Sequence, residues 1–130
     1  MVRRGYGRCV YTSSTAAVWA EPAAAGYNAS KAGLVGLARS VCVDCGKGGV
    51  TANAVLPGWV RTEMAERSAE TEAAERGLTT EDIWRERAAL YPPGRVVEPD
   101  EVAHAILFLA SEESSGISGE AVRVSLGCPW

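Results

Sequence analysis

The chain has 130 residues, and its 13 basic and 16 acidic side chains give a formal net charge of −3. Hydrophobic residues make up 47% and charged residues 22%, the balance of an ordinary globular domain, which excludes intrinsic disorder. The mild acidity favours neither nucleic acid nor an anionic membrane as a partner. We therefore treat residues 1–130 as a single domain.

The number of cysteines and the length of the apolar runs indicate the cellular compartment. The four cysteines are too few and too scattered for a disulfide-stapled small protein. No apolar segment of the signal-peptide type follows the basic N-terminus, and the longest apolar run, residues 105–110, is far shorter than the ~20 residues that span a bilayer. These features predict a cytoplasmic protein with reduced thiols and no membrane partner.

The first half of the chain predicts a strand, a helix and a second strand. Residues 9–12 are rich in β-formers and run into a serine-rich loop. From about residue 27 to 45, apolar residues recur at spacings of three and four, and small or apolar residues fill the other sides. This pattern predicts a helix that is buried over most of its girth. Residues 50–56 follow as a strand, which Pro57 and Gly58 end.

The second half predicts two or three helices and a last strand. A charge-dense region contains a helix around 63–75 and a second helix start at Thr79, whose spacing to Asp82 is that of an N-cap. Pro99 suits the first turn of a further helix. Residues 121–125 have the composition of a strand.

The alternation of these elements defines the fold class as α/β. Strands that are separated by helices favour right-handed crossovers and a parallel sheet covered on both faces. A sheet of about three strands is small for an open parallel fold.

The run Tyr27-Asn28-Ala29-Ser30-Lys31 carries the strongest chemical signal. A spacing of four puts Tyr27 and Lys31 on one helix face, roughly 5–6 Å apart at Cβ. An ammonium this close favours the ionised phenol, which suits Tyr27 to acid-base work near neutral pH. Ser14 lies thirteen residues upstream, just past a predicted strand, at the edge where parallel sheets place ligand crevices. This offset favours Ser14 over Ser13 as the hydroxyl that holds a substrate oxygen.

Several motifs together resemble those of the short-chain dehydrogenase/reductase family. The resemblance covers about residues 7–127 and implies a partial, doubly wound, Rossmann-like sheet, the C-terminal catalytic portion of the family's fold. The segments that carry it are Val10-Tyr11-Thr12-Ser13-Ser14, YNASKAG at 27–33, VTANAVLPG at 50–58, Val60-Arg61-Thr62, Pro99-Asp100-Glu101-Val102-Ala103 and Phe108-Leu109-Ala110-Ser111.

The resemblance implies an NAD(P)-dependent oxidoreductase that interconverts a secondary alcohol and a ketone, with NAD or NADP as cofactor. Ser14 would position the substrate oxygen and Tyr27 would exchange the proton. Lys31 would promote ionisation of Tyr27 and hydrogen-bond the nicotinamide ribose. The cofactor-binding residues implied in this way are Tyr27, Lys31, Pro57, Gly58, Val60 and Thr62.

The family's glycine-rich dinucleotide loop has no counterpart in this sequence. Residues 46–49 are glycine-rich, but they follow a helix and precede a strand, so no helix N-terminus would face a phosphate there. The residue that would select NAD or NADP is missing too, and Val124-Ser125-Leu126-Gly127 departs from the usual Asp-Gly-Gly ending. We interpret the chain as the C-terminal half of the fold. Its first strand would be an unpaired edge, so we expect the chain alone to aggregate or to need a partner that supplies the missing half.

Other candidate residues have simpler interpretations. Cys42 and Cys45 have redox spacing, but a helix C-terminus disfavours the thiolate, and no second pair of ligands suggests a metal. His104 lies beside an apolar helix face and is predicted to be structural. No metal site is expected.

Residues 59–95 are predicted to form a substrate lid, with the charges of 63–87 as its solvated face and no charged residue that stands out as a substrate anchor. Trp19, Trp59 and Trp84 are candidates to line the substrate pocket, with ordinary packing as an equal alternative.

Two other functions fit the same sequence. One is a non-catalytic interaction or assembly module that keeps the fold, and the other is an epimerase or dehydratase of the same family. The family's oligomers also imply a homo-oligomer, a dimer or a tetramer, beside the small-molecule alcohol or carbonyl substrate.

Overall fold

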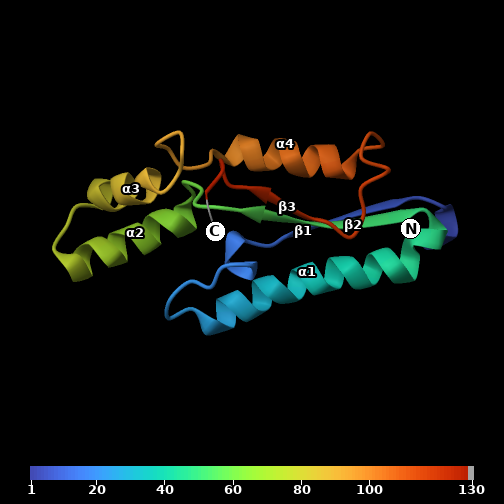
Figure 1. Cartoon of the computed structure of the whole chain (residues 1–130), viewed down its shortest axis with the longest axis horizontal. Helices are drawn as coiled ribbons and strands as arrows, with labels where there is room; N and C mark the ends of the chain where they lie inside the picture. Colours follow the sequence, from blue (N-terminus) through green and yellow to red (C-terminus); the bar gives the residue numbers. More distant parts are fainter. Residues whose placement is uncertain (129–130) are drawn as a thin grey trace.

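Three parallel strands lie at the centre of the computed structural model, which describes residues 1–128 (Figure 1). They are β1 (Gly7–Thr12), β2 (Val50–Pro57) and β3 (Ala121–Val124), in the order β1-β2-β3. The register pairs Gly7 with Val50. The β2 and β3 strands are also parallel, so all three strands end at the same edge of the sheet.

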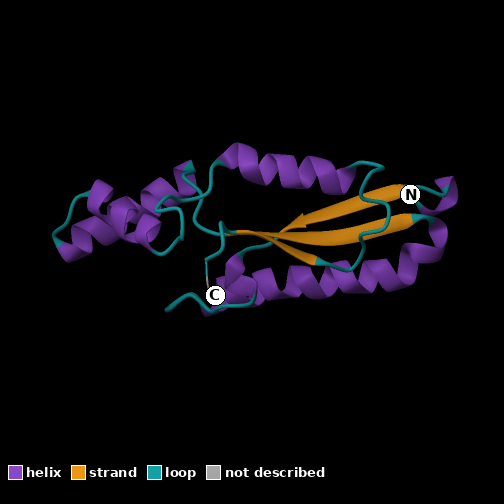
Figure 2. Cartoon of the chain, turned by 45° about the horizontal axis from the view of Figure 1, so that its top comes forward, coloured by secondary structure: helices purple, strands orange, loops and turns teal. Residues whose placement is uncertain are grey.

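Helices cover the sheet on both faces (Figures 1 and 2). Helix α1 (Ala25–Cys45) lies on one face and α4 (Pro99–Ala110) on the other. Helices α2 (Glu63–Arg76) and α3 (Thr80–Ala89) form a hairpin that projects beyond the end of the sheet. This arrangement confirms the predicted α/β class with a parallel sheet and covering helices.

The handedness of the crossovers differs from the prediction. The chain moves across the sheet in one direction, from β1 to β2 to β3, yet α1 and α4 lie on opposite faces (Figure 2). The two connections therefore have opposite hands and cannot both be right-handed. The preference for right-handed crossovers rests on a helix that follows directly from a twisted strand. Here residues 58–98 separate β2 from α4 and carry the chain away from the sheet first.

The central strand supplies most of the core. Ala52, Ala54, Val55 and Leu56 have no exposed surface, as expected for a strand that is paired on both edges and covered on both faces. Asn53 is also fully buried, and its amide is satisfied: Nδ2 donates to the Ile117 carbonyl at 2.9 Å, and the Glu120 N–H donates to Oδ1 at 3.1 Å. The amide thus joins β2 to the loop that precedes β3.

Helix α1 is much more exposed than the sequence predicted. Only Val35 and Ala38 are buried in it, and they pack against β2. Val43 is 80% exposed and Leu37 43%. The prediction of burial over most of the girth is wrong for this chain, because a three-stranded sheet offers α1 a single packing face.

The remaining predicted elements are present. The capping box of α3 is confirmed: the Asp82 N–H donates to Thr79 Oγ1 at 3.1 Å, and the Thr79 N–H donates to Asp82 Oδ2 at 3.1 Å. Within residues 1–128, no helix has the length and apolarity needed to cross a bilayer. Short 3-10 helices occur at η1 (Val2–Arg4), η2 (Thr15–Ala17) and η3 (Gly46–Gly48).

The start of α4 is held by an ion pair. Arg95 donates two hydrogen bonds to the Glu101 carboxylate, both at 2.8 Å, and the Glu98 N–H donates to the same group at 2.8 Å. Pro99 occupies the first turn, where its missing N–H costs nothing. Arg95, followed by the backbone N–H of Glu98, lowers the pKa of Glu101 from 4.5 to about 2.

We predict that Glu101→Gln destabilises the protein at neutral pH and that the difference from the wild type disappears in acid. The pKa of Glu101 is depressed in the folded state, so its contribution is present above its ordinary value and is lost as the pH falls from about 4.5 to about 2. Urea denaturation across this pH range measures the difference. Glu112→Gln, an exposed substitution outside this ion pair, is the matched control for the loss of one carboxylate. A difference for Glu101→Gln that stays constant with pH would contradict the assignment.

Candidate active site

A cleft of about 660 Å³ opens at the edge where the strands end. Its walls come from the segment after β1, the first turns of α1, the turn after β2 with the adjoining α2, one residue of α3, and the start of α4. The lining includes Ser14, Glu21, Tyr27, Lys31, Pro57, Gly58, Trp59, Val60, Thr62, Met64, Ala65, Ser68, Glu72 and Arg87.

The two serines after β1 have different surroundings. Ser13 is 3% exposed, and its hydroxyl donates to the carbonyl of Lys31 at 2.7 Å, so it joins β1 to α1. Ser14 is the N-cap of η2: its Oγ accepts a hydrogen bond from the Ala16 N–H at 3.1 Å. The hydroxyl hydrogen of Ser14 has no acceptor within residues 1–128 and borders the cleft. This geometry gives Ser13 a structural contact and leaves Ser14 able to donate to a ligand.

Tyr27 and Lys31 lie on one face of α1, as their spacing predicted. The Lys31 Nζ atom is 5.5 Å from the centroid of the Tyr27 ring and donates to the carbonyl of Thr12 at 3.1 Å. Tyr27 is 43% exposed, and both side chains line the cleft. The structure therefore brings Ser14, Tyr27 and Lys31 to a single cavity.

Hydrogen bonds from a side chain of α1 fix the loop that precedes this helix. The side-chain amide of Asn28 donates to the Glu21 carbonyl at 2.8 Å and accepts from the Glu21 N–H at 3.2 Å. These paired bonds hold the backbone of Glu21 against the first turns of α1. Glu21 belongs to the cleft lining, although no sequence pattern pointed to it.

The turn after β2 is shaped by Tyr91. This side chain is 3% exposed, and its hydroxyl accepts a hydrogen bond from the Trp59 N–H at 2.5 Å. A Cβ atom on Gly58 would overlap the Tyr91 hydroxyl, so only glycine allows this close approach. Burial raises the pKa of Tyr91 above 10.0, so its phenol stays neutral at ordinary pH.

The residues expected at the cofactor line the cleft together. Pro57, Gly58, Val60 and Thr62 border it with Tyr27 and Lys31. Val60 forms a parallel bridge to Val97, and the Thr62 hydroxyl accepts from the Ala65 N–H at 3.3 Å as the N-cap of α2. The end of β2 and the start of α2 thus fix the positions of these four cleft residues.

The cleft wall contains a buried cation that the sequence patterns did not predict. Arg87 of α3 is 5% exposed, and its guanidinium carbon lies 3.8 Å from the Trp59 ring centroid and 5.0 Å from that of Trp84. Its Nη2 atom donates to Glu72 Oε2 at 3.0 Å. The expectation that residues 63–87 form only a solvated charged face is therefore wrong at Arg87. The one sequence signal was its position four residues after the apolar Ile83, on the same helix face.

The tryptophans and the histidine that the sequence singled out differ in whether they line the cleft. Trp59 lines the cleft, whereas Trp84 is 3% exposed and packs between α2 and α3. Trp19 is 59% exposed and His104 lies on the exposed side of α4, so neither residue belongs to the cleft. Within residues 1–128, no cluster of three or more histidine, cysteine or carboxylate side chains could hold a metal ion.

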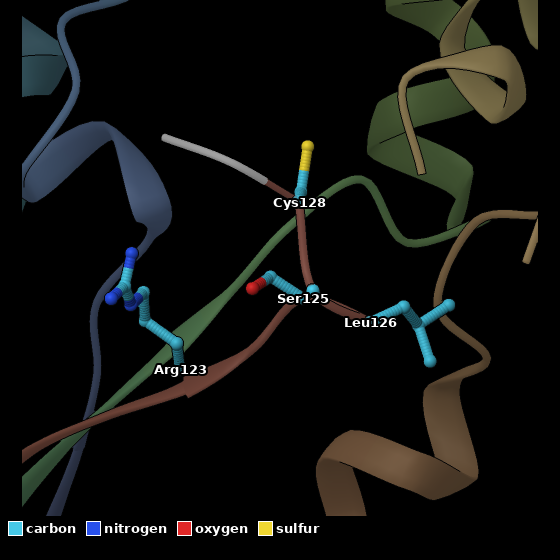
Figure 3. Close-up of a pocket in the computed structure, with 5 residues that line it drawn as sticks. Arg123, Ser125, Leu126 and Cys128 are labelled. Carbon is cyan, nitrogen blue, oxygen red and sulfur yellow. The ribbon is translucent and has the colours of Figure 1, made fainter. Parts of the chain in front are cut away.

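A second, shallower pocket of about 420 Å³ lies at the turn that follows β3 (Figure 3). Ser125 and Cys128 are buried there, and Leu126 extends away from Arg123 on the other side of the chain (Figure 3). Leu126 has a φ of 49°, in the left-handed region that favours glycine. Leu126 packs beside Tyr91, Val97 and Cys128, so apolar contact offsets this strain.

We predict that Gly58→Ala lowers the free energy of unfolding by about 1–3 kcal/mol, because the new methyl group overlaps the Tyr91 hydroxyl. Gly33→Ala is the control: Gly33 lies in α1 with open space around it, so alanine should be neutral or stabilising by up to about 1 kcal/mol. Urea denaturation of both variants measures the effect. In a Tyr91→Phe background Gly58→Ala should cost less, and an equal cost in both backgrounds would refute the proposed contact.

Comparisons with known proteins identify the family of the chain. A family model described as enoyl-(acyl carrier protein) reductase matches residues 1–128. Relatives include a 3-oxoacyl-(acyl-carrier-protein) reductase FabG of Rickettsia conorii, 34% identical over 98% of this chain and 48% of its own. The same activity is named for MabA of Mycobacterium bovis, which is 39% identical over 98% of this chain and 47% of its own. The chain thus spans about half the length of the curated relatives it matches.

Solved structures extend the likeness to three dimensions. A variant of actinorhodin polyketide ketoreductase with NADPH superimposes with a TM-score of 0.91 and 35% identity, over 98% of this chain and 49% of that one. Levodione reductase does so with a TM-score of 0.91 and 31% identity, over 98% and 48%. With a family model that matches almost its whole length, the chain belongs to the short-chain dehydrogenase/reductase family.

Proposed function

We propose that the protein is an NAD(P)-dependent oxidoreductase that interconverts a secondary alcohol and a ketone at the cleft formed by Ser14, Tyr27 and Lys31. The observation that carries the proposal is that these three side chains and the turn after β2 line one cavity at the carboxyl edge of a parallel sheet. A polyketide ketoreductase and a levodione reductase among the structural neighbours support the same class of reaction.

The cleft suits the nicotinamide end of a dinucleotide. Pro57 and Val60 offer apolar surface for a flat ring, and Lys31 and Thr62 add polar side chains to the lining of the same cleft. When bound, the nicotinamide supplies or accepts the hydride at the substrate carbon. One relative of known structure contains NADPH and another is a xylitol dehydrogenase with bound NAD+, so both forms of the cofactor occur among the neighbours.

The residues of the chain would handle the substrate oxygen. Ser14 already accepts a hydrogen bond from the Ala16 N–H, so its hydroxyl hydrogen is available to donate to a carbonyl oxygen. Tyr27 would give its proton to that oxygen during reduction and take it back during oxidation. The Lys31 ammonium, held by the Thr12 carbonyl, would stabilise the resulting phenolate.

Residues 59–95 would act as the substrate lid. The α2–α3 hairpin projects beyond the end of the sheet and supplies part of the cleft lining. Its residues at the cavity include Met64, Ala65 and Ser68 on α2 and Arg87 on α3. This placement suits a segment that covers a substrate and selects among substrates.

Self-association would bury apolar residues that the chain leaves exposed. On α4, Leu107 is 68% and Phe108 46% exposed, and α1 exposes Leu37 and Val43. The two helices cover opposite faces of the sheet, so apolar side chains are exposed on both sides of the molecule. The proposed homo-oligomer would use these helix faces.

We predict that Tyr27→Phe lowers kcat for ketone reduction roughly 10²- to 10⁴-fold, because the variant has no proton to give, while KM changes little. The control is Tyr6→Phe, a tyrosine of similar exposure outside the cleft, which should keep full activity. Nicotinamide absorbance with a panel of alcohols and ketones is the assay. Full activity in Tyr27→Phe, or no absorbance change with any substrate in the wild type, would overturn the proposal.

A further inference from the structure

We infer that the end of the cleft at α2 and α3 is a polar subsite in which Arg87 donates hydrogen bonds to an uncharged oxygen of the substrate. The substrates would then carry a second oxygen function, such as another carbonyl group, at a distance from the reacting one. The inference rests on the proposed function, because it names the part of the substrate that this cleft would recognise.

The guanidinium of Arg87 is held in a fixed orientation. The ring of Trp59 stacks on it at 3.8 Å, and the ring of Trp84 lies 5.0 Å away. Arginine stacks favourably on aromatic faces, and the stacking fixes the plane in which its N–H groups point. A donor that is already immobile loses little conformational entropy when a ligand binds.

Arg87 has more N–H donors than its protein acceptors use. Of its five N–H groups, one on Nη1 donates to the Ala65 carbonyl at 3.3 Å, and two on Nη2 donate to Ser68 Oγ at 3.3 Å and to Glu72 Oε2 at 3.0 Å. The second N–H of Nη1 and the Nε–H have no acceptor within residues 1–128. Because Arg87 lines the cleft, a substrate oxygen can reach this side chain.

The charges around Arg87 favour a neutral oxygen over an anion. Glu72 neutralises Arg87, and its other oxygen accepts from Arg76 at 2.7 Å, which in turn pairs with Glu86 at 2.8 Å. This row of alternating charges sums to zero. A carboxylate or phosphate would find no uncompensated cation at this end of the cleft.

The rest of this end of the cleft fits an apolar body between the two oxygen functions. Trp59, Met64 and Ala65 line the cavity next to the turn after β2. An uncharged chain or ring would lie against these side chains, with one oxygen at Tyr27 and the other at Arg87. Polar groups placed at the ends of an apolar cavity are the usual arrangement for fixing the orientation of a ligand.

Three kinds of substrate with equal chain length test the inference. They are a monoketone, a series of diketones in which the second carbonyl moves stepwise along the chain, and a keto acid. A hydrogen bond from a charged donor is worth roughly 10- to 100-fold, so the best diketone should exceed the monoketone by this factor in kcat/KM. Arg87→Met should remove that preference, so that kcat/KM falls roughly 10- to 100-fold more for the diketone than for the monoketone, with the extra loss in KM. Arg85→Met is the matched control, since Arg85 lies on the same helix, is exposed and pairs with Asp82.

Two kinetic outcomes would overturn the subsite. An equal loss for the monoketone and the diketone in Arg87→Met would show that Arg87 only stabilises the lid. A preference for the keto acid would show that the site takes anions.

A measurement on the wild-type protein covers the case in which Arg87→Met does not fold. The nuclear magnetic resonance signal of the Arg87 Nε–H should shift when the diketone is added without cofactor, and the monoketone should leave it in place. No shift at saturating diketone would refute the subsite. This readout needs no hydride transfer, so a shift without turnover would contradict the proposed function alone, and turnover without a shift would contradict the subsite alone.

Discussion

Two hydrogen bonds at Lys31 join the end of β1 to α1, and the geometry of the cleft depends on them. The Lys31 carbonyl accepts from the hydroxyl of Ser13 at 2.7 Å, and its ammonium donates to the carbonyl of Thr12 at 3.1 Å. One residue of the helix is therefore held through both its backbone and its side chain. Since Tyr27 lies one turn earlier on α1 and Ser14 directly follows Ser13, the same contacts place the phenol, the ammonium and the second hydroxyl around one cavity.

The opposite wall of the cleft depends on a different kind of contact. Helices α2 and α3 bury a small core of two alanines with Ile83 and Trp84. Arg87 adds hydrogen bonds from α3 to α2 and stacks on Trp59 of the turn after β2. The residue that holds the hairpin to the turn is thus also the polar group at the end of the cavity. Substrate recognition and the position of the hairpin are coupled through this side chain.

Local patterns predicted the elements and the shared helix face of Tyr27 and Lys31 on α1. The 3.6-residue period of α1, the Thr79–Asp82 cap and the Tyr27–Lys31 spacing all depend on residues within one or two turns of each other, which a sequence displays directly. The extent of burial of α1 was mispredicted, because periodicity does not reveal how many neighbours cover a helix. Arg87 was missed because its burial depends on Trp59, which is far away in the sequence. The hand of the second crossover depends on a long insertion whose path no local pattern encodes.

A crystal structure of the protein with a nicotinamide dinucleotide and a secondary alcohol tests the central claim most directly. The account predicts that the alcohol oxygen lies within hydrogen-bond distance of both the Ser14 and the Tyr27 hydroxyls, with the nicotinamide against Pro57 and Val60 and its ribose at Lys31. A cofactor bound elsewhere, or an alcohol oxygen that contacts neither hydroxyl, would contradict it.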